Sequence, residues 1–231
     1  MYRLLSAFAL SSLALALLPA AEGRAQTNDC PLSCVLDICT LLPVNSASQT
    51  IGPYGAHASA SYDLRVGVVG YDFNSGDDSS GYASAIARDR FTVIGPSSPQ
   101  LVSFIARLGV RLTVTAISCC RVEAMGSLQE AGGPPVEVAA TAPVFDPEFI
   151  SHVDVDTVLT LPIAHLVGEP FELTYSVAGG GTGVRVTASA DGALSFSGLP
   201  SGYGVVSCQG FAGVVVPTRP RTWGGVKSSY R

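Results

Sequence analysis

The chain has 231 residues, of which 13% are Asp, Glu, Lys or Arg, and its formal net charge is -5 at pH 7. This length fits a single sandwich or barrel domain once a leader is removed. The net negative charge argues against a nucleic-acid partner or an anionic-membrane surface, because both require clustered Lys and Arg.

The first residues have the order of an export signal. Arg3 supplies positive charge, residues 4–18 are nearly continuously apolar, and small residues follow to Ala25. We expect a signal peptide over residues 1–25, cleaved after Ala25 or slightly earlier at Ala20 or Ala21. No second stretch approaches the roughly 20 apolar residues that span a bilayer. The mature chain is therefore expected to be secreted, extracellular or periplasmic, and not an integral membrane protein.

All the cysteines lie beyond the leader, and their even number in an exported chain predicts disulfides. On an extended strand, Cys119 and Cys120 point to opposite faces, so we expect them to take different partners. The alternative is a metal site, although the spacing lacks the close Cys-x2-Cys pairs of structural zinc. We expect the N-terminal three to be stapled to the sheet through the last three, with the pairing left open: Cys30, Cys34, Cys39, Cys119, Cys120 and Cys208.

Residues 26–50 contain prolines and polar residues and are predicted to be an irregular, cysteine-containing lead-in. A first strand follows Ala60, with alternate residues from Tyr62 to Val68 on one face. The next loop is rich in residues that supply hard oxygen ligands, as calcium requires. A solvated turn is the alternative for these four residues: Asp72, Asn74, Asp77 and Asp78.

The strongest signal of the chain is the segment 101–117. Its even-numbered residues from Val102 to Ala116 are all apolar, and the residues between them include Arg107 and Arg111. Only a strand places such a row on one face. A second strand is predicted over residues 82–93.

The second half of the chain continues the alternation. Residues 152–163 are predicted to be a strand with His152, Asp154 and Asp156 on one face, either as a metal or proton-sharing trio or as the wet side of an outer strand. A neighbouring strand is expected over residues 171–177.

Glycines punctuate the rest of the second half. The run 178–183 has no following helix and is interpreted as a flexible loop. Asp191-Gly192 predicts a hairpin between residues 184–190 and 193–197, and a last strand is expected over residues 205–216.

The fold prediction is all-β: a two-sheet antiparallel β-sandwich, jelly-roll-like and disulfide-stapled, over residues 51–216. Ala83 to Val93, Gly168-Glu-Pro-Phe-Glu-Leu173 and Asp191 to Gly202 also resemble segments of uncharacterised exported bacterial β-sandwich proteins, many of which carry a PEP-CTERM sorting tail. The resemblance implies an exported sandwich domain and supplies no catalytic residues. The sorting tail itself is absent.

The basic tail, residues 217–231, holds the only Trp and the only Lys of the chain. It is interpreted as a recognition or sorting segment, or as an end that Trp223 lays against the sandwich. Its candidate recognition residues are Trp223, Lys227, Tyr230 and Arg231.

For function, the sequence favours a non-catalytic structural, surface or extracellular-matrix protein, with a carbohydrate-binding module as the alternative. Tyrosines decide between the two, because a concave face lined by them would favour sugar binding. The four candidates are Tyr54, Tyr71, Tyr82 and Tyr203.

A secreted hydrolase is the third hypothesis. No Gly-x-Ser-x-Gly motif is present, and the glutamates that could form a hydrolytic pair are not distinguished from ordinary surface acids: Glu123, Glu137, Glu169 and Glu172. No enzyme activity and no cofactor are expected, apart from the calcium site considered above.

Overall fold

The protein is described from a computed structural model of the chain. The predicted leader (1–25) and basic tail (217–231) lie outside the residues that it describes, and so does Tyr54. The described residues are 34–35, 38–39, 46–51, 57–75, 79–96, 100–116, 120–144, 150–183 and 185–211.

The long strand predicted around residue 110 is β7 (Leu101–Ala116), and it lies inside one of two sheets. Its even-numbered residues are all buried, and its odd-numbered residues are exposed or half-buried. The prediction for this segment is therefore confirmed through Ala116. A strand of this kind must cover its apolar row with a second layer, which is why the fold is a sandwich.

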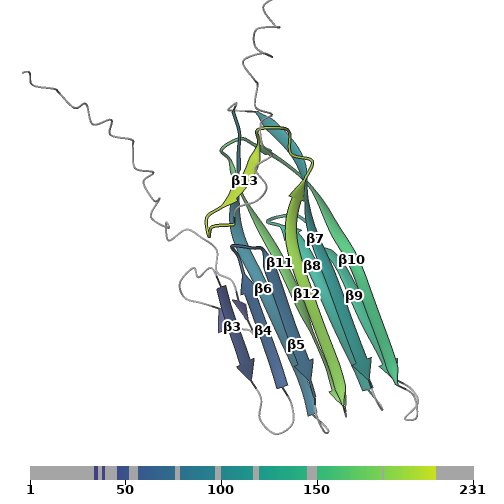
Figure 1. Ribbon diagram of the computed structural model, residues 1–231. Coiled ribbons are helices and arrows are strands. Elements are labelled where there is room, and N and C mark those ends of the chain that lie inside the picture. The colour runs from purple at the N-terminus through teal and green to yellow at the C-terminus, as the bar shows by residue number, and fades with distance from the viewer. Residues whose placement is uncertain are drawn as a thin grey trace, which may run out of the picture.

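The sheet that contains β7 has six strands, all paired antiparallel, and is here called sheet B (Figure 1). Its strand order is β10 (Ser151–Leu166), β7, β12 (Val186–Ser197), β5 (Val68–Asn74), β4 (His57–Asp63) and β3 (Ser46–Ile51).

The opposite sheet, sheet A, has seven strands. Its order is β2 (Ile38–Cys39), β1 (Cys34–Val35), β6 (Ser79–Ile94), β11 (Pro170–Gly183), β8 (Cys120–Glu130) and β9 (Val136–Val144), and β13 (Gly204–Ser207) also pairs with β6. Successive strands change sheets from β5 to β8 and again from β10 to β13. No part of the described chain is helical, so it holds no helix that could cross a membrane.

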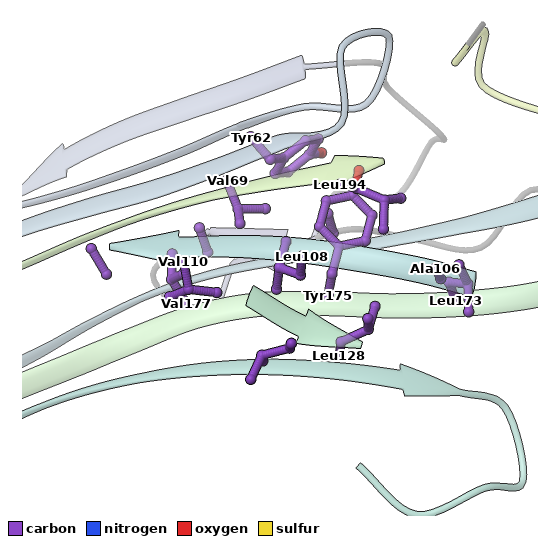
Figure 2. Packing of buried hydrophobic residues seen from close by; sticks show 14 of the residues in the cluster. Tyr62, Val69, Ala106, Leu108, Val110, Leu128, Leu173, Tyr175, Val177 and Leu194 are labelled. Carbon is purple, nitrogen blue, oxygen red and sulfur yellow. The ribbon is translucent and has the colours of Figure 1, made fainter. Parts of the chain in front are cut away.

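The core lies between the two sheets and is built from the inward-facing side of each strand. Figure 2 shows side chains of both sheets meeting in this layer, among them Leu108 and Val110 of β7 and Tyr175 and Val177 of β11. Burying each large apolar side chain contributes roughly 1.5–3 kcal/mol. The all-β, two-sheet antiparallel sandwich predicted from the sequence is confirmed.

One end of the core is aromatic. Its rings lie 5.4–5.9 Å apart between centroids in stacked, tilted and edge-on pairs. They come from β6, β7, β11 and β12 and from the segment after β13: Phe91, Phe104, Phe171, Phe196 and Phe211.

The strand expected from Tyr62 to Val68 is wrong beyond Asp63, where β4 ends. Residues 64–67 form a turn between β4 and β5, with Gly67 at a φ of 70°. Because the turn shifts the alternation by one residue, Val69, Tyr71 and Phe73 face the core instead of Val68. Val66 and Val68 are exposed.

Two predictions that rest on glycine residues are also wrong. The run 178–183 is not a loop, because it lies in β11 and pairs with β6 and β8. Asp191-Gly192 is not a hairpin turn, since both residues lie inside β12 and pair with Arg111 and Val110 of β7. Partners on both sides hold these residues in strands, and this tertiary effect overrides their turn preference.

Two further expectations about connectivity are corrected. The strands predicted at residues 152–163 and 171–177 are not neighbours, because β10 pairs with β7 in sheet B whereas β11 pairs with β6 and β8 in sheet A. The lead-in is not wholly irregular either, since it contains β1, β2 and the edge strand β3. The last strand ends at Ser207, and residues 212–216 lie outside the described chain.

Candidate functional site

The predicted trio on β10 lies on the outer face of an edge strand and is hydrogen-bonded to its neighbour β7. His152 lies 2.8 Å from both the Thr115 hydroxyl and the Asp154 carboxylate, and the Thr113 hydroxyl donates to Asp154 at 2.7 Å. These bonds lower the pKa of Asp154, with Thr113 as the main cause. Because its members bond to the strand and to one another, the trio has the geometry of a solvated strand face.

The candidate calcium ligands are divided. Asp72 and Asn74 lie on the outer face of β5, whereas Asp77 and Asp78 fall outside the described residues. Within the described part of the chain, no group of three His, Cys, Asp or Glu side chains could hold a metal ion. The calcium hypothesis stays a prediction.

The tyrosines do not form the shared face that the sequence suggested. Tyr71 is 3% exposed and Tyr203 is 6% exposed, so both belong to the core, and the Tyr203 hydroxyl donates to Gln100 at 2.6 Å. Burial raises the pKa of the Tyr71 hydroxyl. Tyr82, on the outer face of β6, is 48% exposed. Of the three described tyrosines in the set, Tyr82 alone can offer its ring to a ligand.

Tyr82 stands beside a strip of backbone that has no side chains. Gly179, Gly180 and Gly181 of β11 run between β6 and β8, and the register places Tyr82, Gly180 and Glu123 in one row across the three strands. A Cβ at Gly180 would collide with the Gly81 carbonyl oxygen and lie 2.7 Å from the Tyr82 Cα. Only glycine fits here, because the obstacle is backbone that cannot move aside.

Gly179 and Gly181 face the core, and the missing side chain at Gly180 leaves a hollow of about 450 Å³ on the outer face of sheet A. Adjacent strands lie about 4.8 Å apart, so Tyr82 and Glu123 face each other across about 10 Å with bare backbone between them. Figure 1 shows the three strands β6, β11 and β8 side by side. The hollow, here called the glycine groove, is lined by Gly81, Tyr82, Arg121, Glu123, Gly180, Gly181 and Thr182.

The side of the groove opposite Tyr82 carries one positive and one negative charge, which cancel each other. Arg121 Nη2 lies 2.9 Å from Glu123 Oε2, and the Arg121 side chain is 73% exposed. A guanidinium has five N–H donors, so this ion pair leaves donors that can reach a ligand, while the carboxylate keeps acceptor capacity. The groove thus offers one aromatic face on one side and paired donors and acceptors on the other.

Sequence reasoning found part of this groove and missed the rest. The sequence indicates Tyr82 as a ligand-binding candidate, does not distinguish Glu123 from other acids, and gives no signal at Arg121. The signal that could have located the groove is three successive glycines directly after an alternating strand, with no turn residue other than glycine. A strand without side chains is a place where a ligand can approach the backbone closely.

A second unusual group lies in the core of sheet A. Asp89 of β6 is fully buried, and this burial raises its pKa to about 7. Hydrogen bonds from Ser207 and from the backbone N–H groups of Arg90 and Gln209 act in the opposite direction and lower the pKa, but burial has the larger effect. Its Oδ1 lies 3.5 Å from Cys208 Sγ, and its Oδ2 has no hydrogen-bond partner. Asp89 holds the segment after β13 against β6 and has no access to the glycine groove.

No protein-family model and no curated protein matches this sequence. Among solved structures, the chain is similar to the carbohydrate-binding module TmCBM61, solved in complex with beta-1,4-galactotriose, at 12% identity. The match covers 60% of this chain and 86% of that chain, with a TM-score of 0.28.

Proposed function

We propose that this chain is an exported, non-catalytic β-sandwich protein that binds a neutral saccharide in the glycine groove. One observation carries the proposal: a half-exposed Tyr82 faces the Arg121–Glu123 pair across the bare backbone of Gly180. A sugar ring has an apolar C–H face that can lie on an aromatic ring and hydroxyls at its rim that both donate and accept. In the groove, the Tyr82 ring matches the apolar face and the Arg121–Glu123 pair matches the hydroxyls. The space between them is about as wide as one sugar ring.

Charge favours a neutral ligand over an acidic one. The Arg121 guanidinium would attract an anionic sugar, but Glu123 at 2.9 Å cancels that attraction. Hydroxyl groups, in contrast, satisfy both partners, because each can donate to the carboxylate and accept from the guanidinium. A ligand whose hydroxyls contact both Arg121 and Glu123 therefore needs no net charge.

Binding without hydrolysis is supported by the acids of the groove. Glycoside hydrolysis needs two carboxylic groups on opposite sides of the bond to be cleaved, roughly 5 to 10 Å apart. Of the described residues that line the groove, Glu123 alone carries a carboxyl group, and it is paired with Arg121.

A structural or matrix role without any ligand is the second candidate. The burial of Tyr71 and Tyr203 favours it, because a groove with a single aromatic residue binds more weakly than a platform of several. A failure to bind saccharide in the experiments below would support this second role.

The finer architecture belongs to the same proposal. The strand orders β5–β12–β7–β10 and β6–β11–β8–β9, in which consecutive strands other than β8 and β9 lie in opposite sheets, support the jelly-roll architecture that we propose. The export signal at residues 1–25, the resemblance to exported bacterial sandwich proteins and an oxidising destination are proposed with it.

A disulfide staple at the edge of β6 is also part of the proposal. Cys34 pairs with Ile86 in the ladder, and the Cys208 N–H donates to the Arg90 carbonyl, four residues further along the same edge of β6. We expect Cys208 to form a disulfide in the oxidised chain. This placement supports a link between Cys208 and the N-terminal cysteines Cys30, Cys34 and Cys39.

The proposal is tested on the oxidised chain from residue 26 onward. A glycan array with and without calcium identifies the saccharide class, and calorimetry on the best ligand measures its affinity. We expect binding to neutral oligosaccharides that does not depend on calcium. A blank array at high protein concentration would contradict the proposal.

A matched pair of variants assigns the site. Tyr82→Ala removes the aromatic face, whereas Ile94→Ala truncates an exposed apolar residue at the other end of the same strand. We expect Tyr82→Ala to weaken binding about tenfold and Ile94→Ala to leave it unchanged. Equal affinities for the two variants would place the ligand elsewhere.

A further inference from the structure

A second hollow lies on the outer face of sheet B, where β12 stops short of its neighbour. β12 ends at Ser197, opposite Ile105, so residues 101–104 of β7 pair with β10 alone. The hollow has a volume of about 410 Å³, and we call it the β7–β10 trough. It is lined by Ser103, Phe104, Ile105, Pro162, Ile163, Ala164 and Gly198.

The trough and its rim form an apolar patch on the outer face of sheet B, which also carries the charged and hydroxyl side chains of β10 and β7. Leu101 is 61% exposed and Leu166 is 41% exposed, and the two are paired across the strands beside the trough. Ile105, at 38% exposed, pairs with Pro162 in the same ladder. Exposed apolar surface costs roughly 25 cal/mol per Å², so a cluster of this kind marks a contact surface.

The described chain ends in the core at the same end of the sandwich as this trough. Phe211, its last residue, packs on Phe196 with 5.7 Å between ring centroids, and Phe196 packs on Phe104 at 5.9 Å. Phe104 lines the trough. Trp223 is the twelfth residue after Phe211, and a chain of that length extends to about 40 Å. The tail therefore starts within easy reach of the trough.

The composition of the following residues suits such a contact. Residues 212–231 contain the only Trp of the chain, four basic residues and no acidic residue. Since the whole chain has a net charge of -5, the residues before this tail total -9. A basic tail that carries an aromatic anchor is thus attached to an acidic body, and attraction between the two raises the local concentration of the anchor at the surface.

We propose that the C-terminal segment 212–231 folds back onto its own sandwich and seats the Trp223 indole in the β7–β10 trough. The seated indole covers Ile105 and the apolar rim, and the basic residues stay at the solvent edge of the contact. The segment thereby shields the end of β7 that β12 leaves uncovered. The sugar groove lies on the opposite sheet, so this contact is independent of the function proposed above.

The single Trp makes the proposal directly measurable. In the oxidised chain from residue 26 onward, we expect Trp223 fluorescence with a blue-shifted emission maximum and weak quenching by acrylamide. An emission maximum typical of water-exposed indole would overturn the proposal.

Two substitutions place the indole. Ile105→Lys and Ala164→Arg each put a long charged side chain into the trough, and we expect a red shift and a several-fold rise in the quenching constant. Val68→Lys is the matched control, because Val68 has the same 38% exposure on the outer face of the same sheet. We expect it to leave the fluorescence unchanged. Circular dichroism verifies that each variant folds.

Three outcomes of these variants contradict the proposal. Fluorescence that stays blue-shifted in both trough variants places the indole elsewhere, and a red shift in Val68→Lys of equal size shows a non-specific effect. A blue shift that disappears on dilution assigns the trough to the tail of a second copy, because an intramolecular contact does not depend on protein concentration.

Discussion

The outer faces of the two sheets come from the same alternation of exposed and buried residues, but their exposed side chains are arranged differently. On sheet B, hydroxyls and charges of β10 and β7 bond to each other, as in the contact of Thr113 with Asp154 at 2.7 Å. On sheet A, the same pattern is interrupted by glycines, and Tyr82 and the Arg121–Glu123 pair are left facing each other across a hollow. The comparison teaches that removing side chains from a central strand creates a candidate site more readily than adding charged residues to an edge strand.

The carboxyl groups of the two sheets give the largest expected difference. Buried Asp89 on sheet A has a pKa raised to about 7, whereas the pKa of solvated Asp154 on sheet B is lowered by Thr113 and His152. Because folded Asp89 keeps its proton above the pH at which the unfolded chain releases it, the free energy of unfolding should fall as pH rises from about 4 to about 7.

Asp89→Asn tests this difference. The amide keeps a side-chain oxygen as acceptor and removes the charge, so we expect the variant to be more stable than the wild type at pH 8, by up to about 4 kcal/mol, and equally stable near pH 4. Denaturant unfolding at several pH values measures the change. A wild-type stability that rises between pH 4 and pH 7 would contradict the assignment.

Filling the glycine groove gives the next largest effect. Gly180→Ala forces a methyl group against the Gly81 carbonyl, and we expect a loss of about 1–3 kcal/mol in stability and loss of saccharide binding. Gly132→Ala is a control for backbone strain alone, because its φ of 82° is unfavourable for alanine while the added Cβ meets no neighbour. Saccharide binding that survives in Gly180→Ala would move the ligand away from the groove.

Truncating the walls of the groove should have a smaller effect that separates its two sides. Tyr82→Ala is expected to weaken saccharide binding about tenfold, which corresponds to about 1.4 kcal/mol. Arg121→Ala should weaken it less, since the guanidinium is 73% exposed and competes with water for the sugar hydroxyls. Calorimetry measures both changes, and a larger loss in Arg121→Ala would identify a ligand held chiefly by charge.

The smallest effect is expected on the outer face of sheet B. Thr115→Ala removes its contact of 2.8 Å with His152, and His152→Ala removes that contact and the one of 2.8 Å with Asp154. We expect neither saccharide affinity nor the melting temperature to change measurably, because exposed polar contacts exchange readily with water. A loss of binding in either variant would show that the comparison assigns the site to the wrong sheet.

Part of the candidate site could be predicted from the sequence, because that part depends on the local sequence pattern. Tyr82 lies on a strand of clear alternation, so its outward direction could be argued from the sequence alone. In the sequence, Arg121 and Glu123 resemble any other exposed charged pair, because only their position across β11 from Tyr82 makes them part of the candidate site. The glycine run was interpreted as a loop, since nothing in residues 178–183 records that β6 and β8 hold it in a sheet.

The sequence by itself determined that this chain forms long strands with one apolar face, because a period of two is a local property that each segment carries alone. It also predicted the two-sheet sandwich, since β7 must cover the row from Val102 to Ala116. Only the tertiary structure decided which strands are neighbours, that the turn at Gly67 reverses the faces of Tyr71, and where bare backbone meets an exposed ring. These features depend on contacts between residues far apart in the chain, and such contacts form only when the sheets assemble.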